Sequence, residues 1–255
     1  MKKIDKSRFY VEATGLDPEA YKIAIAQAIG LAEDNSAVKK ITVLTPKKDP
    51  GDILLNVFTA PVVARIKAGG FKHESWPLIK TEALTTYRSA GTSSEIVVAC
   101  GLNDKELFEV EDLSWVTAVI AVSWYPGQLD KWLKTWTPPE LRKKPSTIVA
   151  YPTPSCIVQT ALKDLDDYLD WSKSIHSPRE EEQAAIYFKT LHHYESPLDP
   201  EAIGAHLVSK LNWRAVKARE AEAILHKLNS GGRGPKGSRI SKPHYDQWKR
   251  DCEDK

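Results

Sequence analysis

The sequence predicts an α/β layered domain with a mostly parallel sheet, followed by a small helical domain at its C-terminal end. Runs of mostly apolar residues at 41–44, 95–99 and 117–122 are continuous, which is typical of strands covered by helices on both faces. Segments with helical periodicity separate these runs, and a proline-rich stretch divides them from a basic remainder. We therefore expect a Rossmann-like domain at 1–151, a linker with a connecting helix at 152–177, and a second domain at 178–255.

The predicted strands of the first domain are short and β-prone, and they lie at 9–13, 41–44, 71–79, 95–99 and 117–122. After the first strand, Asp17 is placed to cap a helix that begins at Pro18, and apolar residues then recur at steps of three and four. A second apolar segment at 53–66 ends at the pair Gly69-Gly70. This alternation predicts helices that cross over between parallel strands.

In open parallel sheets, ligands bind where the carboxyl ends of strands and the N-termini of helices meet. Small and hydroxyl-bearing residues that suit a nucleotide or a phosphate follow the predicted strands at this edge: Thr14, Gly15, Thr45, Gly101, Asn103 and Ser123. The same residue types end strands and cap helices in proteins without ligands, which is the simpler interpretation. Neither GxGxxG nor GxxxxGKS/T occurs, so the sequence assigns no cofactor.

Residues 137–155 contain five prolines and the cluster Arg142-Lys143-Lys144, so we expect a domain boundary here. Prolines bracket residues 146–151 without interrupting them, which allows an edge strand. The amphipathic helix expected at 157–172 is predicted to dock on the sheet, with dimerisation as the alternative.

Three helices are predicted in the last domain, at 179–194, 199–211 and 213–228. Three short helices with a tight second turn follow the helix-turn-helix plan. The Gly-rich, basic segment 229–245 that follows is typical of the hairpin wing of a winged helix. The sequence therefore predicts a winged-helix-like domain.

The distribution of charge supports the same prediction. Residues 210–250 hold eleven Lys or Arg and three acidic residues, a net charge of +8, which leaves −6 for the rest of a chain whose formal net charge is +2. Such asymmetry is expected when one domain contacts the phosphates of a nucleic acid, and we favour DNA. The predicted contacts lie on the third helix and the wing: Arg214, Lys217, Arg219, Arg233, Lys236, Arg239 and Lys242. Lys217 falls near the apolar face of a straight helix, and a solvated basic surface is the alternative interpretation.

The three cysteines, Cys100, Cys156 and Cys252, are odd in number and widely spaced, so we expect reduced structural thiols rather than a disulfide framework or a zinc site. The basic start of the chain is not followed by an apolar signal-peptide stretch, and no run approaches the ~18 apolar residues of a membrane helix. These features predict a cytoplasmic protein that does not contact a membrane.

The sequence carries no catalytic signature. The hydrolase motif GxSxG is absent, and His192 and His193 have no matching distant metal ligand. Four aspartates follow candidate strands and would suit a Mg²⁺ site at the carboxyl edge, although each is more simply a helix cap: Asp17, Asp49, Asp52 and Asp104. We therefore expect a protein that is not an enzyme, with a nucleotide hydrolase or nuclease as the alternative.

A strand and loop at 11–18 before the first helix, together with a basic winged-helix-like end, resembles the CRISPR-associated Rossmann-fold (CARF) plus winged-helix group of ligand-sensing regulators. The resemblance implies a sensing domain joined to a DNA-binding domain. A small nucleotide or a partner at the strand ends would change the spacing of two basic domains in a homodimer and hence the affinity for DNA. A non-enzymatic subunit of a larger complex is the remaining alternative.

Overall fold

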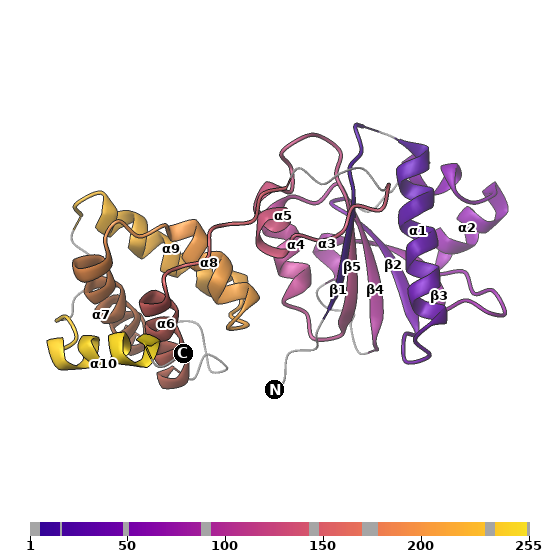
Figure 1. Ribbon diagram of the computed structural model, residues 1–255. Coiled ribbons are helices and arrows are strands. Elements are labelled where there is room, and N and C mark those ends of the chain that lie inside the picture. The colour runs from indigo at the N-terminus through magenta and orange to yellow at the C-terminus, as the bar shows by residue number, and fades with distance from the viewer. Residues whose placement is uncertain are drawn as a thin grey trace. The chain divides into compact units, whose positions relative to one another are not determined.

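The computed structural model describes residues 6–15, 17–47, 51–87, 93–142, 148–169, 178–232 and 238–253. The chain folds into two compact units, Met1–Val149 and Ala150–Lys255. Figure 1 shows the helices and strands of each unit. Within the described ranges, none of the helices combines the length and the apolar character that crossing a membrane requires.

The first unit is built on a five-stranded sheet in which all strands are parallel, as the sequence predicts. The strands, whose order across the sheet is β1-β5-β4-β2-β3, are β1 (Ser7–Val11), β2 (Lys40–Thr45), β3 (Leu78–Ala83), β4 (Glu95–Cys100) and β5 (Val116–Val122). The interior strands β2, β4 and β5 are buried along nearly their whole length, which explains their continuous apolar sequences. The strand predicted at 71–79 begins instead at Leu78, and Phe71 makes an isolated antiparallel bridge to Ile79.

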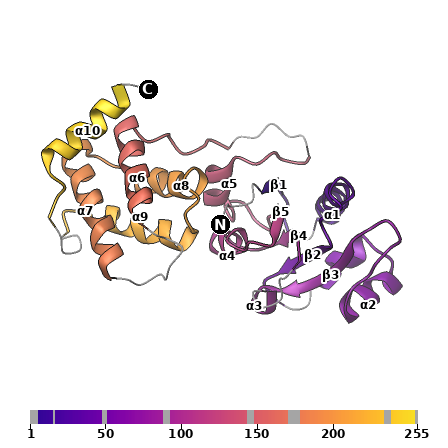
Figure 2. The same ribbon diagram turned by 90° about the horizontal axis from the view of Figure 1, so that it is seen from below.

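Helices cover both faces of this sheet. They are α1 (Pro18–Glu33), η1 (Gly51–Asn56), α2 (Ala60–Ala68), α3 (Leu84–Tyr87), α4 (Asp104–Glu111) and α5 (Asp130–Trp136). The helices α1, η1 and α2 share one apolar core with the strand residues that face them, among them Val43, Val98 and Ile120. The helices α4 and α5 pack together on the opposite face, so the layers are helix, sheet and helix (Figure 2). This is a Rossmann-like parallel α/β fold.

The proline-rich segment returns to the sheet at its β1 edge. The N–H of Tyr10 donates to Pro139 O at 3.2 Å, and the N–H of Leu141 donates to Tyr10 O at 3.0 Å, so Glu140 forms an isolated parallel bridge with Tyr10. Pairing at this point is possible because Leu141, unlike a proline, has an N–H to donate. The edge strand predicted at 146–151 does not form in its described part, 148–151.

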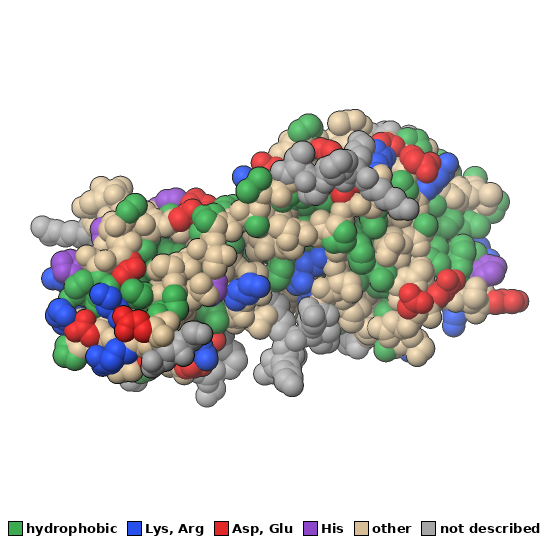
Figure 3. All heavy atoms as spheres, in the orientation of Figure 1, with side chains coloured by type: hydrophobic (Ala, Val, Ile, Leu, Met, Phe, Trp, Pro, Cys, Tyr) green, Lys and Arg blue, Asp and Glu red, His purple; other side chains and the backbone are tan. Residues whose placement is uncertain are grey.

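The second unit is helical in its described residues. Its helices are α6 (Cys156–Tyr168), α7 (Pro178–Glu195), α8 (Pro200–Ser209), α9 (Ala215–Asn229) and α10 (Lys242–Glu253). The three helices predicted for this region are confirmed as α7, α8 and α9, and α10 begins at the end of the segment predicted as a wing. On the face seen in Figure 3, Lys and Arg side chains lie beside Asp and Glu over the region of α10.

The helix α6 belongs to this second unit, where it packs against α7 and α10. Its packing partners within this unit are thus helices, and docking on the sheet stays a prediction. Its buried stripe includes Val158, Leu162 and Leu165, and an apolar stripe of this width is equally well covered by neighbouring helices.

The helices α8 and α9 form an antiparallel hairpin. Close to the turn, the N–H of Trp213 donates to Leu207 O at 2.9 Å. At the far end, Nε2 of His226 lies 3.0 Å from Oε1 of Glu201, so contact extends along the whole of α8. The helices of a helix-turn-helix instead cross at roughly 90–120°. No strand occurs in the described part of the segment 229–245, so the predicted wing is not seen and the winged helix is not shown.

A disulfide joins Cys156 and Cys252. The expectation of reduced thiols is therefore wrong for these two residues, because the fold brings α6 and α10 together across 96 positions of sequence. Cys100 is a free thiol in the core of the first unit, as expected.

Candidate functional site

The predicted ligand site lies at the carboxyl edge of the parallel sheet. Because the strands run in the same direction, the loops that follow β1, β2, β4 and β5 meet at this edge. Three of the predicted residues, Thr14, Gly15 and Asn103, are exposed. The other three predicted residues are buried, and they are Thr45, Gly101 and Ser123.

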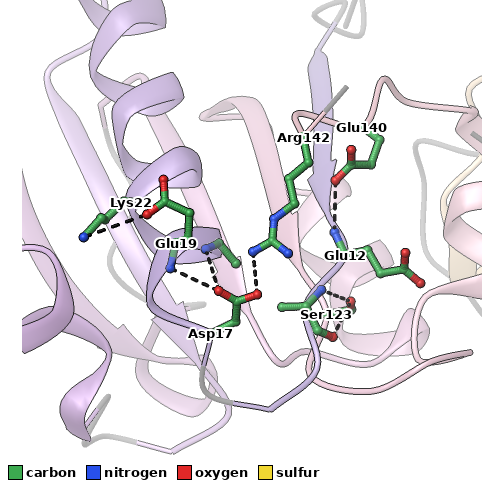
Figure 4. A network of polar contacts seen from close by, with 9 residues as sticks. Glu12, Asp17, Glu19, Lys22, Ser123, Glu140 and Arg142 are labelled. Atoms are coloured by element: carbon green, nitrogen blue, oxygen red, sulfur yellow. Dashed lines mark hydrogen bonds and ion pairs between the residues drawn. The ribbon is translucent and has the colours of Figure 1, made fainter. Parts of the chain in front are cut away.

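Hydrogen bonds join the loop after β1 to the loop after β5. The N–H of Ala13 donates to Oγ of Ser123 at 3.2 Å, and the N–H of Gly15 donates to Trp124 O at 2.8 Å. Figure 4 shows Ser123 in this position. The hydroxyl of Ser123 is therefore already used to fasten two loops together.

Asn103 and Thr45 also bond within their own loops. Oδ1 of Asn103 accepts from the N–H of Glu106 at 3.0 Å, and Oε2 of Glu106 accepts from the N–H of Asn103 at 2.9 Å, a capping box at the start of α4. Oγ1 of Thr45 donates to Lys47 O at 2.6 Å. The simpler interpretation of these two residues, as cap and turn residues, accounts for their positions.

Trp124, in the loop after β5, packs against Gly101 in the loop after β4. Gly101 has a positive φ of 70°, and a Cβ at this position would overlap the Trp124 indole ring. The side chain of Gln128 joins both loops, since its Oε1 accepts from the N–H of Trp124 at 2.6 Å and its Nε2 donates to Gly101 O at 2.8 Å. Gly101 is therefore required by backbone conformation and close packing. Trp124 and Gln128 belong to this edge although no sequence motif indicates them.

An ion pair links the start of α1 to the proline-rich segment (Figure 4). Oδ1 of Asp17 accepts from the N–H groups of Glu19 and Ala20, at 3.1 and 3.3 Å, and caps α1 as predicted. Oδ2 of Asp17 accepts from Nη2 of Arg142 at 2.5 Å. This bond is the largest cause that lowers the pKa of Asp17. Arg142 is thus a further residue of the edge that sequence reasoning does not place there.

Three buried donors at this edge have no hydrogen-bond partner among the described residues apart from a contact between two of them, the side chains of Tyr21 and Trp124. They are the hydroxyl of Tyr21, the indole N–H of Trp124 and Nε of Arg142. Burial is the main cause that raises the pKa of Tyr21 to about 12, whereas the nearby indole of Trp124 acts to lower it. Buried donors of this kind suit the oxygens of a phosphate or a carboxylate.

The aspartates weighed as a metal site have other roles where they are described. Asp104 caps α5 from outside, because its carboxylate accepts from the N–H groups of Trp132 and Lys131 at 2.7 and 3.3 Å. Burial raises the pKa of Asp104. Asp49 and the side chain of Asp52 lie outside the described residues. Among the side chains that are described, no group of three His, Cys, Asp or Glu is arranged to hold a metal ion.

The predicted nucleic-acid contacts of the third helix lie around the start of α9. Arg214 is exposed at the N-cap of α9, where its side chain makes no capping bond. Arg219 is half-buried, and its Nε donates to Ala215 O at 3.3 Å. Lys217 is only 6% exposed, and its Nζ lies 3.1 Å from Oε2 of Glu220. Its position on the apolar face of α9 does not fit the predicted contact with phosphate.

The predicted contacts of the wing are partly outside the described residues, namely Arg233 and Lys236. Arg239 and Lys242 are described and exposed. Lys242 pairs with Asp246 one turn further along α10, at 2.7 Å, and this bond raises the pKa of Lys242. One of the two described wing contacts thus shares its charge with an acidic neighbour.

A carboxylate fastens α10 to the rest of the second unit. Oδ2 of Asp164 on α6 accepts from the hydroxyl of Tyr187 at 3.1 Å and from the indole N–H of Trp248 at 3.0 Å. Nε2 of His244 lies 2.8 Å from the same oxygen. These three partners come from α7 and α10, so one side chain of α6 holds three helices together.

A comparison with known protein families finds a match in the second unit. Residues 154–249 match the model of a family described as a domain of unknown function, DUF1889. The matched range runs from just before α6 into α10, so the helical unit is the part of the chain that is similar to this family. No curated protein and no solved structure matches the chain.

Proposed function

We propose that the chain binds nucleic acid, with DNA favoured, and contacts its phosphates through the basic surface around the start of α9. The observation that carries this proposal is the N-terminus of α9, where Arg214 is the N-cap and the first turn has no acidic side chain. The unbonded N–H groups of such a turn attract phosphate oxygens. In α1, α4 and α8 the corresponding groups are capped by a side chain, and an acidic residue lies in the first turn.

Charge segregation within the second unit supports the proposal. Residues 150–255 hold 16 basic and 16 acidic residues, yet residues 210–250 alone carry +8. Two of the acidic groups outside this basic segment, Asp164 and Asp166, accept hydrogen bonds from tryptophan N–H groups at 3.0 and 2.6 Å. These carboxylates are therefore engaged by aromatic donors of their own unit, while Arg214 and Arg239 of the basic segment are exposed and suited to face phosphates.

The finer form of this proposal is a winged-helix arrangement, with α9 at a DNA groove and the segment 229–245 against the adjacent backbone. Arg239 and Lys242, exposed at the end of that segment, support a second contact with phosphate. Since α9 is paired with α8 along its length, we expect its N-terminal turn, rather than the whole helix, to meet the groove.

The test is a salt titration of the full-length protein on duplex DNA, followed by fluorescence anisotropy, with single-stranded RNA as a second probe. Each phosphate contact contributes ~0.9 to the slope of log K against log salt. The double variant Arg214→Ala/Arg239→Ala should lower this slope by about 1.8, whereas the control Lys105→Ala, at an exposed lysine of α4, should leave it unchanged. No binding at low salt, or an equal loss with Lys105→Ala, contradicts the proposal.

We also propose that the first unit senses a small anionic ligand, such as a nucleotide, at its carboxyl edge. The specific observation in favour is the group of three buried donors on Tyr21, Trp124 and Arg142, of which Nε of Arg142 has no partner among the described residues and the other two contact only each other. A ligand that differs in affinity between two states of the protein would then regulate binding of nucleic acid. Regulation through a homodimer further predicts a mass of two chains by light scattering.

Thermal unfolding with inorganic phosphate or AMP tests this second proposal. A bound ligand raises the melting temperature of the first unit. Trp124→Phe should reduce that rise, because it removes the indole N–H. The matched control is Trp115→Phe, since the indole N–H of Trp115 is also buried, beside the hydroxyl of Tyr87, but lies before β5, at the opposite edge. An equal response in both variants, or no shift with either probe, rejects this site.

A further inference from the structure

The disulfide joins the two ends of the helical unit. Cys156 is the first residue of α6, and Cys252 lies in the last turn of α10. Their Cα atoms are 5.8 Å apart, within the range that a disulfide spans without movement of the backbone. The bond therefore closes a loop that contains nearly all of the second unit.

The bond is accessible, in contrast to the third cysteine. Cys156 is exposed and Cys252 is partly exposed. Cys100 is fully buried in β4, and burial raises the pKa of its thiol to about 12. A small thiol in solution is therefore able to reach the disulfide, whereas Cys100 is protected from the same reaction.

The two sulfur atoms have different electrostatic surroundings. Cys156 lies at the N-terminus of α6, whose first turn has no acidic residue, and a thiolate there is stabilised by the helix dipole. Cys252 lies at the C-terminal end of α10, between Asp251 and Glu253, where a negative charge is disfavoured. Cys156 is therefore the better leaving group when the bond is cleaved.

One acidic side chain also approaches the start of α6. Oε2 of Glu195 accepts from the hydroxyl of Ser155, the N-cap of α6, at 3.4 Å. The hydroxyl of Tyr245 on α10 donates to the other carboxylate oxygen of Glu195. Two donors thus share the charge of Glu195, which limits its repulsion of a thiolate on Cys156.

We propose that Cys156–Cys252 is a reversible redox site that exchanges with small thiols such as glutathione. The thiolate of one small thiol attacks Sγ of Cys252, the S–S bond breaks, and its electron pair leaves with Sγ of Cys156. A second thiolate attacks the small-molecule sulfur of the mixed disulfide and releases Cys252 as a thiolate. Two small thiols are thereby oxidised to a disulfide, and the protein gains two electrons and two protons.

Reduction frees the end of α10 and leaves the rest of the helix docked. The N–H of Ile240 donates to Oγ1 of Thr190 at 2.9 Å, and Trp248 is bonded to Asp164, so the start and middle of this segment keep their contacts without the disulfide. Cys252 ties the last turn to α6, where its sulfur also lies 3.3 Å from Oγ1 of Thr160. The redox state therefore sets how firmly the C-terminal end of α10 is held.

The test equilibrates the full-length protein with mixtures of reduced and oxidised glutathione, alkylates free thiols, and locates the label by mass spectrometry. Cys156 and Cys252 should change together from unlabelled to labelled as the mixture becomes more reducing, while Cys100 stays unlabelled in the folded protein. Melting of the second unit should fall by on the order of 10 °C on reduction, because the closed loop no longer restricts the unfolded chain.

Variants separate this effect from other consequences of reduction. Cys156→Ser and Cys252→Ser should each lower the melting temperature without reductant and lose the response to glutathione, whereas Cys100→Ala should keep that response. The proposal is overturned if both cysteines are labelled in every mixture, or in none, or if labelling proceeds without a change in melting. These measurements involve no nucleic acid, so their outcome is independent of the proposed function.

Discussion

The first unit is built in layers around a sheet, whereas the second is a set of helices whose last member, α10, is held by a few specific contacts. In the first, helices cover the interior strands, and α1, η1 and α2 share an apolar core with one face of the sheet. In the second, buried apolar residues lie along α6 to α9, and α10 is joined to these helices by the carboxylate of Asp164, by the buried rings of Tyr245 and Trp248, and by one disulfide. Single substitutions should therefore affect the two units differently.

The largest expected effect is that of Trp248→Ala. Trp248 is 2% exposed and its indole N–H bonds to Asp164, so truncation leaves a cavity and removes one of the three partners of that carboxylate. We expect a loss of about 3–5 kcal/mol from the free energy of unfolding of the second unit. Calorimetry should show its transition at a lower temperature and the transition of the first unit unchanged.

The control for this prediction is Tyr168→Ala, at an aromatic residue of α6 that is 55% exposed. Its effect should stay within ~0.5 kcal/mol. If Trp248→Ala shifts neither transition, stability of the second unit is not concentrated at α10.

An intermediate effect is expected at Gly101 in the first unit. Alanine there requires a positive φ and overlaps the Trp124 ring, which should lower the free energy of unfolding by about 2–4 kcal/mol. Gly30→Ala is the matched control, because Gly30 lies in α1 with open space at its Cβ position, and alanine should stabilise the helix by up to ~1 kcal/mol. Urea unfolding of both variants measures the difference, and equal effects would exclude Trp124 as a packing constraint.

The smallest effect concerns the ion pair between Asp17 and Arg142. The folded state lowers the pKa of Asp17, so the pair contributes stability at pH values above the unfolded pKa, and this is lost as pH falls through the folded pKa. Arg142→Met should cost about 1 kcal/mol at pH 7, because the two side chains are 18% and 26% exposed, and nothing once the pH has fallen below the lowered pKa of Asp17.

Lys22→Met provides the comparison for this ion pair, since Lys22 and Glu19 are more than half exposed and lie 3.9 Å apart. It should change the free energy of unfolding by less than ~0.3 kcal/mol at any pH. A cost of Arg142→Met that persists at low pH would show that this residue acts by packing rather than by charge.

Local signals in the sequence predict the helices and strands of both units, but they do not predict which of these elements lie next to each other in space. Asp17 and Asp199 cap the helices that they are expected to cap, because capping depends on residues within one turn. The interior strands are recognised from their apolar runs, but the order β1-β5-β4-β2-β3 depends on which strands pair across long connections. In the last part of the chain, the wing is predicted from glycine and charge, whereas Tyr245 and Trp248, three residues apart on one face, belong to a helix.

The sequence predicts where the candidate site lies, but it does not predict which residues bond to its polar groups. Parallel strands place the predicted residues at one edge, but the partners that use their polar groups come from distant sequence: Asp17 and Arg142 are 125 residues apart. The burial of Lys217, in contrast, is predictable from local sequence. The helical wheel places Lys217 on the apolar face of α9, and the structure places it there as well. The disulfide leaves no local signal, since an odd number of cysteines does not reveal a pair formed by packing of α6 on α10.

The pairing of Tyr10 with the proline-rich segment has a consequence for solubility. Unpaired backbone groups on an edge strand recruit strands from other molecules and so start aggregation. On the β1 edge, residues 139–141 of the same chain take up both backbone groups of Tyr10, and on the β3 edge Phe71 exchanges two 2.8 Å hydrogen bonds with Ile79. Both margins of the sheet are thus partly shielded by the chain itself, which disfavours open-ended growth of the sheet from one copy to the next.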